Sequence, residues 1–200
     1  QGYPSVGATE NLMTAATTAR GTTVLENVAR EPEIVDIGRM LQAMGAQIEG
    51  LGTTTLTITG VPRLSPVTHR TVPDRIVAGT WAFAAAVTGG RVQIRGAEPS
   101  HLGVVLDKLR AAGCDVDVAE GRFTVQGPSR PRAINVSTLP YPGFPTDLQP
   151  FVVALNAVAE GSGIITENVF EARWGFTAEL ERLGARGAPG GHPARGGGGG

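Results

Sequence analysis

Asp147 lies in the short sequence FPTDLQ, residues 144–149, where two interpretations of its carboxylate compete. Thr146 and Gln149 have the spacing of a capping box, in which both side chains bond to free backbone groups of a helix's first turn. Asp147 would then be a first-turn acid stabilised by the helix dipole. Alternatively, its carboxylate does acid–base chemistry. The two interpretations are compatible, because a capping box uses only the other two side chains.

Cys114 is the single cysteine and the second candidate for chemistry. A nucleophilic cysteine needs a partner that lowers the pKa of its thiol, together with access to solvent. Cys114 opens the sequence CDVDV at the place where two similar segments have Ala46 and Ala185. The neighbouring Asp115 and Asp117 would, if anything, raise the pKa of the thiol. We therefore interpret it as a small packed residue.

The remaining composition excludes several classes of protein. His69, His101 and His192 are scattered without a recognised ligand spacing, so we predict no metal site and no cofactor. A formal net charge of −1 provides no field to attract nucleic acid or an anionic membrane. No apolar run reaches the roughly 18 residues of a membrane-spanning helix, and the first residues do not resemble a signal peptide. The sequence indicates a cytoplasmic protein with neither nucleic acid nor membrane as partner.

Three segments of the chain share one order of elements. Each has an Ala-rich helix, a strand led by glycine, an amphipathic helix and a strand that opens with GA or GC. The segments cover residues 10–50, 74–118 and 146–186. From the strand-leading to the helix-ending glycine the spacings are 24, 23 and 23 residues, for Gly21 and Gly45, Gly90 and Gly113, and Gly161 and Gly184. This regularity predicts an α/β fold built from three repeat units.

Hydrophobic periodicity predicts how each unit packs. The amphipathic helices place apolar residues on one face, namely Ile34, Ile37, Met40, Leu41 and Met44 in the first segment and Leu102, Val105, Leu109 and Ala112 in the second. Both helices stop at a glycine that suits the left-handed position after a helix. The helix over residues 81–87 is apolar almost all round, which predicts that it is enclosed. Residues 56–60 and 122–127 alternate apolar and polar, as half-exposed strands that close a unit do.

Four motifs resemble the UDP-N-acetylglucosamine 1-carboxyvinyltransferases, a family of enolpyruvyl transferases. They read PSVGATENLMTAATTARGTTVLENVAREPEIVDIGRML, PDRIVAGT, FPTDLQ and TENVFEARW. The resemblance runs from Tyr3 to Arg186 and implies a central fragment of the family's inverted α/β barrel, which has two domains of three repeats each. Residues 1–72 would be the last repeat of the first, catalytic-loop domain, and 73–186 two repeats of the second. Residues 187–200 read as a disordered Gly-rich tail.

The resemblance also implies a reaction and its binding residues. The family transfers the enolpyruvyl group of phosphoenolpyruvate to the 3-hydroxyl of UDP-N-acetylglucosamine, the first committed step of peptidoglycan synthesis and thus of cell-wall biogenesis, cell shape and division. Ser5, Val6 and Gly7 match the UDP-sugar-binding loop, and a position just before a helix suits an anion. Asp147 matches the carboxylate that contacts the reacting sugar hydroxyl. Val169 matches a backbone contact to the nucleotide sugar.

Three further charged residues lie in motifs that line or support the family's cleft. Glu31 and Glu33 occur in REPE, and Arg75 occurs in PDR. The alternative is that they form surface ion pairs or are acids at a helix start. The loop also departs from the family at Tyr3, where some members carry a lysine.

The family's Lys-Asn pair, its phosphoenolpyruvate-binding arginines and its catalytic-loop cysteine match nothing in this sequence, and Cys114 occupies a different place in the repeat. We therefore expect the chain to carry mainly the UDP-sugar-binding side of a transferase. The alternative is an inactive fragment or a weak UDP-sugar-binding module. The sister enzyme 5-enolpyruvylshikimate-3-phosphate synthase is less favoured, because SVGATEN and FPTD resemble the UDP-sugar enzymes.

Overall fold

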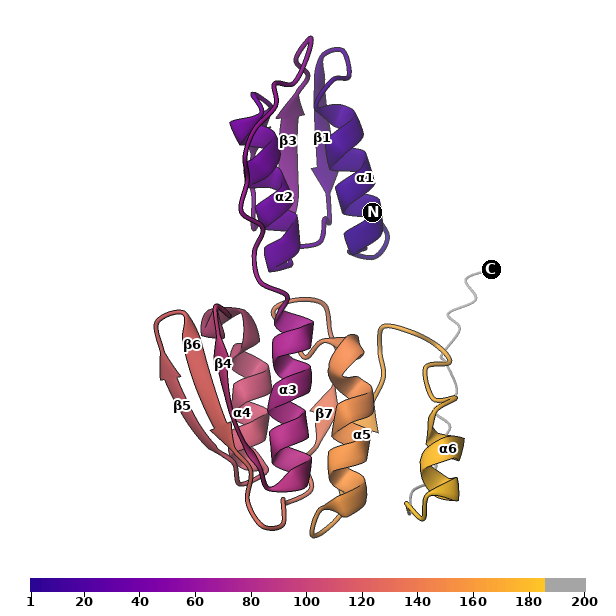
Figure 1. Ribbon diagram of the computed structural model, residues 1–200. Helices are drawn as coiled ribbons and strands as arrows, with labels where there is room; N and C mark the ends of the chain where they lie inside the picture. The colour runs from indigo at the N-terminus through magenta and orange to yellow at the C-terminus, as the bar shows by residue number, and fades with distance from the viewer. Residues whose placement is uncertain (186–200) are drawn as a thin grey trace, which may run out of the picture. The chain divides into compact units, whose positions relative to one another are not determined.

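Helices alternate with short strands along the chain, as the repeated order of elements predicts (Figure 1). The computed structural model describes residues 1–185, so the predicted tail at 187–200 lies outside the described residues. The chain divides into two compact units. The first comprises Gln1–Pro73 with Pro140–Pro142, and the second comprises Asp74–Leu139 and the chain from Gly143 onward.

The first unit packs two helices on a three-stranded antiparallel sheet. Its elements are α1 (Val6–Ala16), β1 (Thr22–Glu26), α2 (Pro32–Ala43), β2 (Gln47–Glu49) and β3 (Thr55–Thr59). The strand order is β1-β3-β2. Leu56 and Ile58 alternate with polar residues along β3 and are buried, which confirms the predicted alternation. They meet Met13 of α1 and Leu41 of α2, so both helices contribute to one core.

The second unit begins with a repeat that has the same arrangement of helices and strands as the first unit. Its elements are α3 (Arg75–Thr88), β4 (Arg91–Arg95), the 3-10 turn η1 (Pro99–Leu102), α4 (Gly103–Ala111), β5 (Asp115–Ala119) and β6 (Arg122–Gln126). Its sheet has the order β4-β6-β5, again antiparallel. The predicted apolar face around α4, from Leu102 to Ala112, is buried. In both sheets the strand that comes last in sequence lies in the middle. The predicted half-exposed alternation is wrong for β6, where Thr124 is buried together with Phe123 and Val125.

The described chain after β6 folds differently from the two repeats before it. It contains the two-residue strand β7 (Val136–Ser137) and, in the third segment, the 3-10 turn η2 (Thr146–Leu148), α5 (Gln149–Val158), β8 (Ile165–Thr166) and the short helix α6 (Thr177–Arg182). β7 and β8 pair in parallel, and residues 1–185 contain no third three-stranded sheet. Gly45 and Gly113 adopt positive φ after their helices, at 103° and 98°, as predicted, and Gly184 does the same at 94°.

Helix α3 is less enclosed than its composition predicts. One side packs on α5, which lies beside it in Figure 1, through Phe83 stacked on Phe151 with ring centroids 6.5 Å apart. The Phe83 ring also meets the edge of Phe144 at 6.4 Å. On the opposite side Val77 and Trp81 are 53% and 60% exposed. An all-round apolar helix is enclosed only where other elements cover every side, and among residues 1–185 no side chain buries these two.

The structure buries Cys114, and this burial raises the pKa of its thiol from 9.0 to about 11. Desolvation is the cause, rather than the neighbouring aspartates that the sequence suggested. Above pH 9 the unfolded thiol loses its proton while the folded thiol keeps it. We therefore expect the free energy of unfolding to fall between about pH 9 and pH 11, by up to about 3 kcal/mol. Urea unfolding of the protein and of Cys114→Ala across this pH range measures the difference, and equal slopes would contradict it.

Candidate functional site

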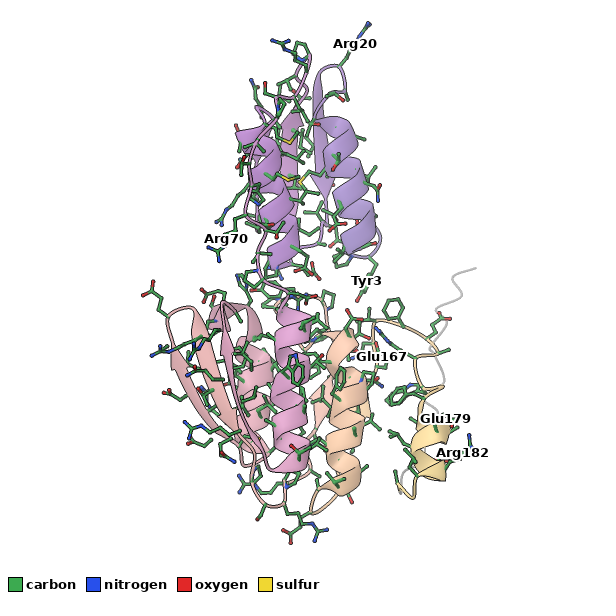
Figure 2. The ribbon with its side chains drawn as sticks, viewed as in Figure 1. Tyr3, Arg20, Arg70, Glu167, Glu179 and Arg182 are labelled. Atoms are coloured by element: carbon green, nitrogen blue, oxygen red, sulfur yellow. The ribbon has the colours of Figure 1, made fainter. Side chains whose placement is uncertain are left out.

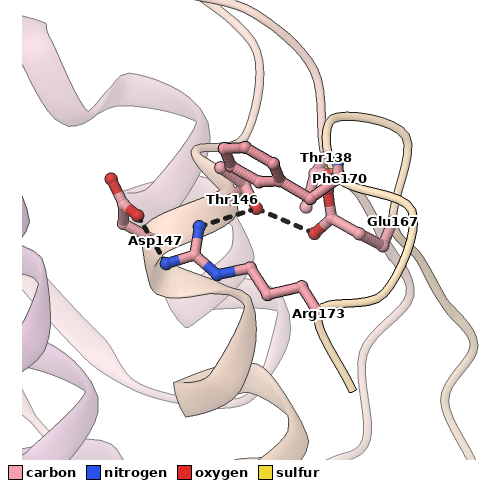
Figure 3. A network of polar contacts seen from close by, with 6 residues as sticks. All are labelled: Thr138, Thr146, Asp147, Glu167, Phe170 and Arg173. Carbon is pink, nitrogen blue, oxygen red and sulfur yellow. Dashed lines mark hydrogen bonds and ion pairs between the residues drawn. The ribbon is translucent and has the colours of Figure 1, made fainter. Parts of the chain in front are cut away.

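Asp147 lies in η2 and presents its carboxylate at the surface, with 54% of the side chain exposed. Its Oδ1 accepts a hydrogen bond from Arg173 Nη2 at 2.7 Å (Figure 3). Among residues 1–185 no hydrogen bond reaches Oδ2. The carboxylate is therefore held by one oxygen while the other remains available to a ligand.

The predicted capping box at Thr146 and Gln149 is wrong. The Thr146 hydroxyl donates to Glu167 Oε2 at 2.9 Å, and it accepts from Arg173 Nη1 at 3.1 Å. No side chain caps η2 or α5. Gln149 is fully buried, and neither its amide nitrogen nor its amide oxygen has a hydrogen-bond partner in the described part of the chain. A tertiary contact with a carboxylate has replaced the local cap, because Glu167 offers the hydroxyl a charged acceptor.

Glu167 organises the segment that follows β8. Its Oε1 accepts from the Thr138 hydroxyl at 2.9 Å and from the backbone N–H groups of Val169 and Phe170 at 2.8 and 3.1 Å. The Val169 N–H is thus occupied, which leaves its carbonyl or side chain for any contact with a nucleotide sugar. Through Arg173, Thr146 and Glu167, hydrogen bonds connect the predicted site residues Asp147 and Val169. Figure 3 shows the part of this network between Asp147 and Glu167.

Glu167 and Arg173 were not among the predicted site residues, although both lie in the motif TENVFEARW. The bonds from Glu167 to the amides two and three residues later are a local signal that the sequence could have given. Its bonds to Thr138 and Thr146 cross 29 and 21 residues and leave no such signal.

Ser5, Val6 and Gly7 form the start of helix α1, as the sequence predicts. Ser5 is the N-cap, and its Oγ accepts from the backbone N–H of Ala8 at 3.3 Å. Val6 and Gly7 occupy the first turn, whose N–H groups lack partners inside the helix. A Cβ on Gly7 would have no atom within 4 Å, so the surface there is open. At the end of the preceding loop, Tyr3 is 45% exposed (Figure 2).

Glu31 and Glu33 belong to the same unit as the Ser5 loop, whereas Arg75 begins α3 in the second unit. The Ala29 N–H donates to Thr9 Oγ1 at 3.0 Å, which places the segment before α2 beside the first turns of α1. Glu31 precedes α2 and is only 7% exposed, and its Oε2 has no hydrogen-bond partner among the described residues. Glu33 is a first-turn acid of α2. Of the two, Glu31 is the unusual one, because a carboxylate is seldom buried with an oxygen that lacks a hydrogen-bond partner.

Residues 2–194 match the sequence model of the family described as EPSP synthase (3-phosphoshikimate 1-carboxyvinyltransferase). The chain belongs to this family of enolpyruvyl, or carboxyvinyl, transferases. The solved enolpyruvyl transferase NikO from Streptomyces tendae is similar with a TM-score of 0.78 and 31% identity, over 88% of this chain and 42% of that chain. EPSP synthase from Acinetobacter baumannii shares the fold with a TM-score of 0.53 and 20% identity, over 82% of this chain and 39% of that one.

Particular relatives are proteins named UDP-N-acetylglucosamine 1-carboxyvinyltransferase. The chain is 55% identical to the one from Mycobacterium tuberculosis (strain CDC 1551 / Oshkosh), over 96% of this chain and 46% of that protein. It is 56% identical to the one from Nocardia farcinica, over 96% of this chain and 45% of that protein. The chain thus spans less than half the length of these relatives. The predicted resemblance and α/β fold class are confirmed.

None of the helices in the described range, residues 1–185, is both long and apolar enough to cross a membrane.

Proposed function

We propose that this chain forms the UDP-sugar-binding part of a cytoplasmic transferase of peptidoglycan synthesis. The transferase joins the 3-hydroxyl oxygen of UDP-N-acetylglucosamine to the enolpyruvyl carbon of phosphoenolpyruvate. The hydroxyl proton and phosphate leave, and Asp147 accepts or orients that proton. Residues 1–72 and 73–186 are assigned to the last repeat of one domain and two repeats of the next. The division of the chain between Pro73 and Asp74 supports this assignment.

The observation that carries the proposal is 55–56% identity to UDP-N-acetylglucosamine 1-carboxyvinyltransferases along 96% of the chain. The site supports it in two ways. Helix α1 presents the free N–H groups of its first turn, which can hold an anionic group such as a diphosphate. In the second unit, the exposed Asp147 has an oxygen available for a hydroxyl group.

Calorimetry and a phosphate assay on the purified 200-residue chain test this proposal. We expect UDP-N-acetylglucosamine to bind weakly, and we expect no phosphate release when phosphoenolpyruvate is added. The family's phosphoenolpyruvate-binding groups match nothing in this sequence, and groups that act as a unit lose most of their effect when some are missing. Heat from shikimate 3-phosphate but not from the UDP-sugar would favour the sister activity. Absence of binding would leave an inert fragment, and turnover would contradict our assignment to the UDP-sugar side.

A further inference from the structure

We propose that Glu167 is the positioning residue for Asp147, acting through Thr146 and Arg173; its relevance to catalysis rests on the function proposed above. Glu167 does not contact Asp147. A chain of three hydrogen bonds joins the two carboxylates instead, from Glu167 to Thr146, from Thr146 to Arg173 and from Arg173 to Asp147 (Figure 3). All four residues belong to the second unit.

The Glu167 carboxylate is fully engaged as an acceptor. Oε1 takes the Thr138 hydroxyl and the N–H groups of Val169 and Phe170, and Oε2 takes the Thr146 hydroxyl. Four donors around one partly buried carboxylate hold the segment after β8 against the segment that begins η2. Because charge-assisted hydrogen bonds are about twice as strong as neutral ones, this group can fix the geometry of the whole network.

The charge of Glu167 also sets the direction of the hydrogen bonds. A hydroxyl has one proton to donate, and that of Thr146 points to Oε2 of the carboxylate. Its lone pairs are then free to accept from Arg173 Nη1 at 3.1 Å. The second terminal nitrogen of the guanidinium, Nη2, donates to Asp147 Oδ1 at 2.7 Å. The planar guanidinium therefore bridges Thr146 Oγ1 and Asp147 Oδ1. Because the group is rigid, the position of the Thr146 oxygen determines where the Asp147 carboxylate is bound.

An aromatic contact also helps to hold the Arg173 side chain in place. The guanidinium carbon lies 5.3 Å from the centre of the Phe170 ring. Phe170 is itself held by the bond from its N–H to Glu167. Glu167 thus orients Arg173 from two sides, through the Thr146 hydroxyl and through the ring.

An amide at position 167 would break this arrangement at a definite place. If the oxygen of Glu167→Gln stays with the two backbone N–H groups, its NH₂ group faces the Thr146 hydroxyl. The hydroxyl must then turn to accept from the amide, so its own proton loses the carboxylate to which it is bonded. A bond to a neutral amide is about half as strong as one to a carboxylate, so the Thr146 oxygen that accepts from Arg173 Nη1 is held less firmly. We therefore expect the turn at Val169 to remain, whereas the Arg173 guanidinium should no longer be held in one orientation.

Nitrogen-15 NMR of the arginine side chains tests this without any ligand. Held by two oxygens, the Arg173 guanidinium should rotate slowly and show separate Nη signals, which Arg173→Lys assigns by their loss. In Glu167→Gln these signals should merge. Glu171→Gln is the matched control, because Glu171 lies in the same loop, is exposed and accepts no hydrogen bond from the described residues. Separate signals in Glu167→Gln would overturn the proposal.

Calorimetry with UDP-N-acetylglucosamine tests the link to Asp147. Loss of a hydrogen bond to a charged group should make Asp147→Asn bind at least about 10-fold more weakly. Glu167→Gln should weaken binding similarly, and the double variant should be no worse than either single one, because coupled residues are not additive. Additive losses would overturn the proposal. With Glu171→Gln, the effect of Asp147→Asn should remain complete.

The two arms separate the possible failures. If the unchanged chain binds no UDP-sugar, the proposed function fails, while the NMR signals still decide whether Glu167 seats Arg173. If Glu167→Gln does not fold, Thr146→Val removes only the hydroxyl that joins Glu167 to Arg173, at a half-buried position. Merged Nη signals in Thr146→Val would support the chain of contacts, and separate signals would overturn it.

Discussion

Asp147→Asn should lower turnover by at least about 10²-fold, the lower end of what a general acid–base group contributes. The variant should be made in a complete enzyme. A chimera in which this chain replaces the matching segment of the 55%-identical M. tuberculosis relative provides one. Asparagine keeps the size of the side chain and an oxygen for Arg173. It removes the charge that accepts a proton from the sugar hydroxyl. Steady-state phosphate release measures the loss.

Asp107→Asn is the matched control for this experiment. Asp107 also pairs with an arginine, Arg110, at 2.9 Å, but on the exposed surface of α4. Exposed pairs contribute at most about 1 kcal/mol, so both stability and turnover should stay near those of the unchanged chimera. If Asp147→Asn kept full turnover but melted earlier, Asp147 would be structural and the catalytic role would have to be abandoned.

Phe83→Ala should destabilise the second unit by about 3–5 kcal/mol, the range for large aromatic truncations in a core. Phe83 is 1% exposed. Its ring contacts Phe151 of α5 and Phe144, which lies just before η2. Removing the ring loses apolar burial, two aromatic contacts and the filling of the space among them. Urea unfolding followed by circular dichroism measures the change in the free energy of unfolding.

Trp81→Ala on the same helix provides the comparison. Its side chain is 60% exposed, so truncation should cost less than about 1 kcal/mol. A cost for Phe83→Ala as small as that for Trp81→Ala would mean that α3 and α5 are not held together by this aromatic cluster.

Local patterns were enough to predict much of the fold. The Gly45 and Gly113 helix ends, the buried face of α4 and the alternation along β3 depend on residues close together in sequence. The enclosure of α3 was overestimated, because composition says how apolar a helix is but not which elements cover each side. Trp81 shows the difference.

For the site, the sequence alone was enough to predict the resemblance to enolpyruvyl transferases, the helix start at Ser5 and the burial of Cys114. Motifs, caps and a residue's place within a repeat are all local features of the chain. The partners of Thr146, in contrast, depend on how distant parts of the chain come together. Its spacing to Gln149 is that of a capping box, but Glu167 lies 21 residues away in the chain and 2.9 Å away in space. A hydroxyl has a single proton to donate, and a charged acceptor brought close by folding takes it in preference to a backbone group.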